Sequence, residues 1–162
     1  MRITLLLFAF LFVFAITPAM FAQVKAGQDQ ATLRDPDLER DSYHNLDVAR
    51  NYFKLKKAYV ASLKRCEEII AANPAFSRID EALYMAGQSS LNLAEGKGKQ
   101  KASQYVVREG DTKKTLTGEE FRELARSYFS QLVNSYPDST FRPQAEDALR
   151  VLGRPKTASS GQ

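Results

Sequence analysis

The sequence predicts an all-α fold, built as a short α-solenoid of about five helices with one long basic loop inserted between two of them. Two observations predict it. Apolar residues recur at three- and four-residue spacing through most of the chain between Ser42 and Leu152, which is the stripe of amphipathic helices. Two of these segments end at a proline, Pro74 and Pro137, in matching sequence contexts, and this indicates a duplicated unit.

The N-terminus is typical of a secretory signal peptide, which we assign to residues 1–22. Met1 and Arg2 precede an apolar run of about fourteen residues, and small residues follow it. Such a run is shorter than the roughly 20 residues that a membrane-spanning helix needs. Residues 23–41 are polar with little periodicity and predict a flexible leader. Three cleavage positions stay open: after Ala19, Ala22 or Ala26.

The chain has a single cysteine, Cys66, so it cannot form an internal disulfide and must rely on its apolar core. No cysteine stands near the expected cleavage region, and we therefore expect no lipid anchor at the mature N-terminus. The expected location is the periplasm, with association at the inner face of the outer membrane left open.

Two helices are expected between Ser42 and Asn73, with a break near Lys56, and Pro74 cannot continue the second. A third helix is expected from about Ser77, as its cap, to Gly96. Helical spacing resumes at Thr117 or Gly118 and stops at Tyr136; a last helix runs from Ser139 or Thr140 to Leu152. The predicted helical domain thus covers residues 42–153, and the small polar residues 154–162 predict a disordered tail.

Residues 96–118 interrupt the helical pattern and predict an exposed loop, with a transient hairpin around Glu109, Gly110 and Asp111. The loop has six basic residues against two acids, an excess that equals the formal net charge of +4. It is either a solvated linker or a contact for an acidic partner or anionic lipid headgroups. The basic residues are Lys97, Lys99, Lys101, Arg108, Lys113 and Lys114.

Each proline-terminated segment places a small residue, two bulky residues and the proline at matching offsets of four, seven and twelve. The two sets are Ala125, Phe129, Leu132 and Pro137, and Ser62, Cys66, Ile69 and Pro74. A small residue is needed where two helices cross closely, and a bulky one fills the groove beside it. This pattern resembles the second half of a tetratricopeptide repeat, a helix hairpin of 34 residues.

The first half of that repeat matches at Leu83, Ala86 and Gly87, which give the leucine–glycine-like pair of the family. In the first unit the same places hold Leu46, Ala49 and Arg50, so that an arginine stands where the family has glycine. The resemblance implies two and a half repeats, and the loop at 96–118 accounts for the extra spacing between the two prolines.

Two longer stretches, SRIDEALYMAGQSSLNLAEG and ARSYFSQLVNSYPDSTFRPQAEDALRVLG, are similar to the BamD-like family of outer-membrane assembly proteins. The resemblance covers about residues 41–153. It implies a tetratricopeptide scaffold that helps to place barrel proteins and binds envelope proteins, among them the barrel-assembly machinery. Members are commonly lipoproteins with about five repeats, and this chain departs from both features. A related envelope protein of the cell-division and Tol type stays open as an alternative.

We expect no catalysis, cofactor or metal. His44 is the only histidine and has no second ligand cluster at metal spacing, and Cys66 lies on an apolar stripe where a thiol behaves as a small hydrophobe. An enzyme that depends on Cys66 or His44 is the rival from another class. The near balance of 23 basic and 19 acidic residues does not favour a nucleic-acid binder. The oligomeric state is left open.

The expected function is therefore to hold protein partners. In repeats of this kind the first helix of each pair lines the concave surface, where apolar anchors give affinity and polar side chains set the register. The polar candidates for this groove are Asp47, Asn51, Lys54, Tyr84, Gln88 and Asn92.

Overall fold

The computed structural model describes residues 34–153 of the chain. The predicted signal peptide, most of the predicted leader and the predicted tail lie outside these residues. Within them the chain forms five α-helices: α1 (Pro36–Arg50), α2 (Tyr59–Ala72), α3 (Ile79–Ala94), α4 (Gly118–Ser135) and α5 (Arg142–Leu152). The all-α, tetratricopeptide-like fold predicted from the sequence is confirmed.

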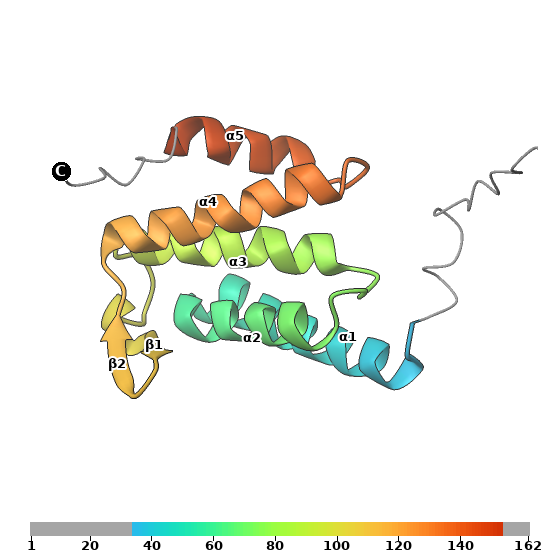
Figure 1. Cartoon of the computed structure of the whole chain (residues 1–162), viewed down its shortest axis with the longest axis horizontal. Coiled ribbons are helices and arrows are strands. Elements are labelled where there is room, and N and C mark those ends of the chain that lie inside the picture. Colours follow the sequence, from blue (N-terminus) through green and yellow to red (C-terminus); the bar gives the residue numbers. More distant parts are fainter. Residues whose placement is uncertain (1–33, 154–162) are drawn as a thin grey trace, which may run out of the picture.

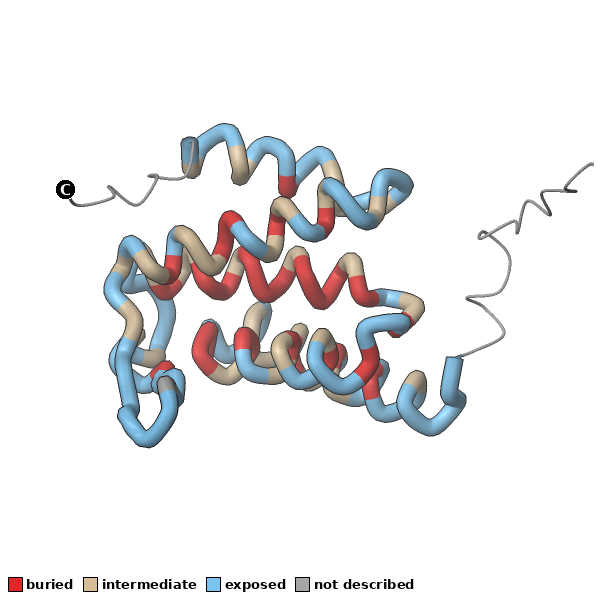
Figure 2. The backbone as a smooth tube through the Cα atoms, viewed as in Figure 1, coloured by how far each residue is buried: buried red, intermediate tan, exposed pale blue. Residues whose placement is uncertain are grey.

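The helices pack in sequence order, each on the next, to give a short stack (Figure 1). Helix α3 lies in the middle of the stack, between α2 and α4, and Figure 2 shows that it is the most completely buried element. Its buried side includes Ala82, Leu83 and Ala86, none of which is exposed to solvent. The hydrophobic core is therefore continuous: α3 packs against α2 on one side and against α4 on the other.

The small residues predicted at the helix crossings, and the bulky residues predicted to fill the grooves beside them, are buried as expected. Ala125, Phe129 and Leu132 of α4 are fully buried, and so are Ser62 and Cys66 of α2. A repeat whose apolar stripe faces its neighbours in this way stacks without needing a sheet or a disulfide.

Gly87 shows most clearly why the leucine–glycine pair is needed. A Cβ atom placed on Gly87 would lie 2.5 Å from Cε1 of Phe129. Real Cβ atoms do not approach other heavy atoms so closely, because this distance is well inside van der Waals contact. The Phe129 ring thus fills the space that a side chain at Gly87 would need, and α3 and α4 approach closely at this point.

Helix α1 begins at Pro36, six residues before the predicted start at Ser42, so the prediction of a flexible leader through Asp41 was wrong at this end. The Asp35 side chain caps the helix by accepting hydrogen bonds from the backbone N–H groups of Asp37 and Leu38. Proline is favoured in the first helical turn, where no N–H is needed. Pro36 was included in the predicted leader because proline is common in loops, but a proline that follows a capping aspartate is also a typical helix start.

The predicted break near Lys56 is confirmed. Helix α1 continues into a π-helical turn, Asn51–Lys56, and Lys57 then adopts a left-handed backbone conformation with φ of 52°. A non-glycine residue at positive φ cannot continue a right-handed helix, so the chain reverses here into α2.

Two other helix starts lie later than predicted. Helix α3 begins at Ile79 and receives no side-chain cap, so the predicted Ser77 cap was wrong. Ser77 instead makes a hydrogen bond of 2.8 Å between its Oγ and the hydroxyl of Tyr43 in α1. Helix α5 begins at Arg142 rather than at Ser139 or Thr140. In both cases the residues after the proline form a turn, although their helical spacing predicted that they belong to the helix.

Helix α4 begins as predicted. Thr117 accepts a hydrogen bond from the N–H of Glu120, and the Glu120 carboxylate accepts one from the N–H of Thr117, which is a complete capping box. The Lys114 ammonium also pairs with Glu120. These donors hold the pKa of the Glu120 carboxyl down at about 2, with the Lys114 hydrogen bond as the largest cause.

The segment 96–118 has more structure than the exposed loop that was predicted. It contains a short 3-10 turn (Ala102–Gln104) and an antiparallel hairpin of β1 (Val106–Glu109) and β2 (Thr112–Thr115). Gly110, with φ of 60°, lies in the turn between the strands. The hairpin stands at the end of the stack where α3 ends and α4 begins (Figure 1).

Candidate functional site

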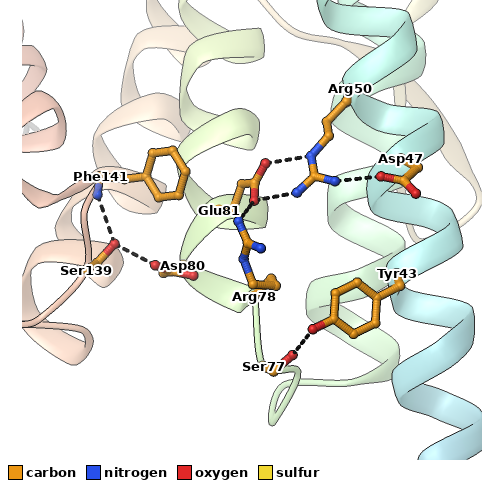
Figure 3. A network of polar contacts seen from close by, with 9 residues as sticks. All are labelled: Tyr43, Asp47, Arg50, Ser77, Arg78, Asp80, Glu81, Ser139 and Phe141. Carbon is orange, nitrogen blue, oxygen red and sulfur yellow. Dashed lines mark hydrogen bonds and ion pairs between the residues drawn. The ribbon is translucent and has the colours of Figure 1, made fainter.

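The first helices of the successive pairs, α1 and α3, are joined to each other and to the start of α5 by a network of polar contacts (Figure 3). Arg50 of α1 donates to both carboxylate oxygens of Glu81 in α3, with Nε–Oε1 and Nη2–Oε2 distances of 2.7 Å each. Arg78 and Asp47 extend the network through ion pairs with Glu81 and Arg50 respectively.

This pair is largely removed from water, since the side chain of Glu81 is 9% exposed and that of Arg50 is 26% exposed. The hydrogen bond to Glu81 is the largest cause of a raised pKa at Arg50, so the guanidinium stays charged. Bidentate arginine–carboxylate pairs fix geometry as well as adding energy. Arg50, which departs from the repeat pattern by replacing glycine, thus connects one repeat to the next, a role that sequence spacing alone could not reveal.

Aromatic and hydroxyl contacts join α3 to the start of α5. The ring of Tyr84 stacks on the ring of Phe141, with centroids 5.0 Å apart and planes inclined by 23°. Ser139 donates a hydrogen bond of 2.7 Å from its Oγ to Oδ2 of Asp80. Specific contacts therefore connect α1, α3 and the beginning of α5 to one another.

Three of the predicted groove residues lie in a row on α3. Tyr84, Gln88 and Asn92 are four residues apart, and all three are partly buried. Gln88 donates from Nε2 to the Tyr84 hydroxyl at 3.4 Å, and Asn92 donates from Nδ2 to the carbonyl oxygen of Gln88 at 2.8 Å. The row keeps its polar groups at the surface with side chains already held in place.

The other three predicted groove residues belong to α1 and the turn that follows it. Asp47 is held by Arg50, whereas Asn51 and Lys54 lie in the π-helical turn and are exposed. Within the described part of the chain, neither Asn51 nor Lys54 has a side-chain hydrogen bond or ion pair to α3. The structure thus brings the α3 residues together as one row and leaves the α1 residues less closely connected to it.

The α3 row ends at a pocket of about 450 Å³ between α3, the start of α4 and the end of α5. Leu91 lies one helical turn from Gln88, so the polar row and the pocket share one face of α3. Val151 on α5 is 89% exposed at this pocket, which is unusual for a large aliphatic side chain in a helix. The pocket is lined by Leu91, Glu95, Glu119, Arg122, Ala148, Val151 and Leu152.

A second pocket, of about 320 Å³, lies at the other end of the stack between the α2–α3 and α4–α5 turns. Its lining is largely polar and includes Ser77, Asp80 and Ser139, which the network described above already uses. It exposes less apolar surface than the pocket at Val151.

Neither candidate for enzymatic chemistry is in a setting that favours reaction. Cys66 is fully buried in α2, and burial is the largest cause that raises the pKa of its thiol. His44 is exposed on α1. Among residues 34–153 no group of three or more histidine, cysteine, aspartate or glutamate side chains is arranged to hold a metal ion.

Glu67, beside Cys66, is half-buried and accepts hydrogen bonds from two tyrosines. The hydroxyl of Tyr105 donates at 2.6 Å and that of Tyr128 at 2.9 Å. Burial raises the pKa of the Glu67 carboxyl, and the two donors partly offset this effect. Because Tyr105 belongs to the inserted segment and Tyr128 to α4, Glu67 connects the insertion to the helical stack.

Of the basic loop residues, Lys97 and Lys114 form ion pairs, with Glu95 and Glu120. Arg108 and Lys113 lie opposite each other on the two strands of the hairpin. Lys99 and Lys101 are exposed on the segment that leads into the 3-10 turn. The six residues are therefore spread over two places, the hairpin and the segment just after α3.

The fold defines a class, the short helical repeat proteins of tetratricopeptide type. The model of one family, described as outer membrane lipoprotein (YfiO), matches residues 34–154, so the chain belongs to that family. No curated protein and no solved structure matches the chain.

This family assignment confirms the resemblance to BamD-like proteins predicted from the sequence, and it indicates a location in the bacterial envelope. In the described range no helix has the length and apolar character needed to cross a membrane. The matched range begins at residue 34, close to the start of α1 at Pro36, so the family domain includes the residues that the sequence-based boundary at Ser42 left out.

Proposed function

We propose that this protein is a non-enzymatic scaffold that binds protein partners in the periplasm and takes part in the assembly of outer-membrane proteins. Membership of the outer membrane lipoprotein family supports the envelope role. The observation that carries the binding role is the α3 face, where a fixed polar row of Tyr84, Gln88 and Asn92 leads into a pocket with both aliphatic and charged lining residues.

The chemistry of this face suits a partner segment with one apolar anchor. An aliphatic or aromatic side chain of the partner fits between Leu91, Val151 and Leu152, where it would remove exposed apolar surface from water. The carboxamides of Gln88 and Asn92 are placed to hydrogen-bond the backbone or polar side chains of the same segment. Such a combination of anchor and register is how helical repeats recognise peptides.

The rigidity of the face adds to this argument. Because Arg50, Glu81 and the stacked Tyr84–Phe141 pair hold the first helices of the repeats together, little ordering is needed when a partner binds. A preformed surface loses less conformational entropy on binding than a flexible one.

The experiment compares two exposed aliphatic residues in the native envelope. Val151→Ser removes the anchor site, and Val106→Ser is the matched control, since Val106 is 41% exposed but lies outside the pocket lining. Each variant is tagged, crosslinked in living cells and purified, and the proteins that copurify are identified by mass spectrometry. We expect Val151→Ser to lose its main protein partner at least fivefold while Val106→Ser retains it.

Recovery of barrel-assembly components by the wild-type protein would support the assembly role, whereas recovery of Tol-system or peptidoglycan-associated proteins would replace it with the cell-division alternative. Equal recovery of partners by both variants would show that the α3–α5 pocket is not the binding site.

A further inference from the structure

The turn between α1 and α2 presents four consecutive residues to solvent, three lysines and one leucine. Lys54, Lys56 and Lys57 are all exposed, and Leu55 between them is 75% exposed. Within residues 34–153 none of these lysines forms an ion pair with a carboxylate. A large aliphatic side chain surrounded by unpaired cations is an uncommon arrangement on a protein surface, where apolar residues are usually covered and charges usually mixed.

The segment that follows α3 is held against this turn by three specific contacts. The N–H of Lys99 donates to the carbonyl oxygen of Lys57 at 2.9 Å. The side-chain Oε1 of Gln100 accepts from the N–H of Ala61 at 3.0 Å and so caps the start of α2, which has no side-chain cap of its own.

Gly98 provides the third contact. It has φ of 93°, and a Cβ atom at this position would lie 2.5 Å from the Tyr59 ring. Only glycine lets the backbone come this close at that φ. Lys99 and Lys101 are therefore fixed in place beside the α1–α2 turn instead of belonging to a free linker.

The result is one surface made from two segments far apart in the sequence. We call the exposed lysines of these two adjoining segments, Lys54, Lys56, Lys57, Lys99 and Lys101, together with Leu55, the lysine surface; the hydrogen bond from Lys99 to Lys57 joins the segments. The nearby Glu95 does not neutralise it, because that carboxylate pairs with Lys97. Holding five like charges together costs stability through mutual repulsion, a cost that an anionic ligand would remove.

We propose that the lysine surface docks on an anionic lipid bilayer, with the lysine ammonium groups at the headgroup phosphates and Leu55 inserted among the acyl chains. Clusters of four to eight basic residues are typical of attraction to anionic membranes. An exposed leucine beside lysines adds the apolar term that interfacial binding needs. Tyr52, whose ring lies 5.1 Å from the Lys56 ammonium, is a residue type that membrane interfaces favour.

A lipid surface fits these residues better than an acidic protein does. All five cations are lysines, whose long stems and compact charges suit a fluid layer of phosphates. Recognition of protein carboxylates favours the planar fork of arginine, as this molecule itself uses in the Arg50–Glu81 pair. The proposal does not depend on the pocket at Val151, since none of the residues that line this pocket belongs to the lysine surface; Lys54, a candidate for the partner groove, is left unchanged in the tests below.

The first test measures how the full chain partitions onto vesicles of phosphatidylcholine alone and of phosphatidylcholine with 30 mol% phosphatidylglycerol, by flotation at low and at about 0.5 M salt. The test variant is Lys56→Gln/Lys99→Gln/Lys101→Gln. It leaves Lys57 unchanged because of its left-handed backbone. The matched control, Arg40→Gln/Lys64→Gln/Arg150→Gln, lowers the net charge equally at exposed residues elsewhere.

We expect the wild type to partition at least tenfold more onto anionic vesicles at low salt and to lose this preference at high salt. Each lysine near such a surface contributes about fivefold, so the test variant should lose most of the anionic preference and the control little of it. Any binding by the apolar N-terminal run is common to all three proteins and does not depend on the anionic lipid. Equal preference in both variants would overturn the proposal.

The second test asks whether Leu55 enters the bilayer. Leu55→Cys carries an environment-sensitive dye, with Asp138→Cys in the exposed α4–α5 turn as its control; the native Cys66 is buried and is protected from labelling. Anionic vesicles should shift the dye emission to the blue at position 55 and leave it unchanged at position 138. No shift at position 55, or binding of an acidic protein through these lysines without any binding to vesicles, would contradict the proposal.

Discussion

Replacement of Gly87 by alanine tests the close packing of α3 on α4, on which the repeat architecture depends. Two effects oppose each other. Alanine is favoured over glycine inside a helix by about 1 kcal/mol. The new Cβ, however, would lie 2.5 Å from the Phe129 ring, which is fully buried and has no free space to move into. Overpacking of this kind costs about 1–3 kcal/mol, so the steric term should win.

We therefore expect Gly87→Ala to lower the free energy of unfolding by up to about 2 kcal/mol, measured by urea denaturation followed by circular dichroism. Phe129→Leu provides the control background, because leucine lacks the two ring atoms nearest to the added Cβ. In that background the alanine substitution should be neutral or stabilising by up to about 1 kcal/mol. If Gly87→Ala stabilised the wild-type protein, or cost the same in both backgrounds, the inferred close approach of α3 and α4 would be refuted.

Three further predictions concern the network, the thiol and the half-buried carboxylate. Arg50→Gln should lower the free energy of unfolding in urea by about 1–3 kcal/mol, because it leaves Glu81 with Arg78 as its only cationic partner. The control is Arg40→Gln, which removes an exposed ion pair with Asp37 on the same helix and should lower this free energy by less than about 0.5 kcal/mol. Cys66 should resist thiol reagents at neutral pH in the native protein and react in urea. Rapid labelling of the native protein would instead support the alternative of an enzyme that depends on Cys66. The raised pKa of Glu67 means that folding favours its protonated form, so its contribution to stability is present below the unfolded pKa near 4.5 and is lost as pH rises through the higher folded pKa. Glu67→Gln should flatten the pH dependence of the denaturation midpoint in that range; an unchanged profile would argue against this titration.

The stacking of helices could be predicted from the sequence because the size of the residue at each repeat position indicates how closely the helices pack there. Gly87, Ala125 and Ser62 are small where helices cross, and the prolines Pro74 and Pro137 end the helices that they follow. Helix starts were less predictable. Asp35 and Pro36 begin α1 although they precede the apolar stripe, because a cap needs only a local side-chain acceptor and no buried face.

The site was only partly predictable for a related reason. Tyr84, Gln88 and Asn92 could be placed on one face by their four-residue spacing, and the structure has them in one row. The Arg50–Glu81 pair joins residues 31 positions apart, and the contact of Gln100 with Ala61 spans 39. Contacts between elements so distant in the chain follow from how the helices stack, which local spacing does not determine. An arginine in place of the repeat glycine was the available signal for the first of them.

In the proposed function, protein partners bind to the α3 face that leads to the pocket and do not bind to the exposed side of α4. A photo-reactive amino acid placed at Gln88 on α3 tests it most directly, with Ser127, an exposed residue on α4, as the comparison position. After irradiation of living cells, the account predicts a discrete adduct with an envelope protein from position 88 and little or none from position 127. Adducts from position 127 alone, or equal adducts from both, would contradict it.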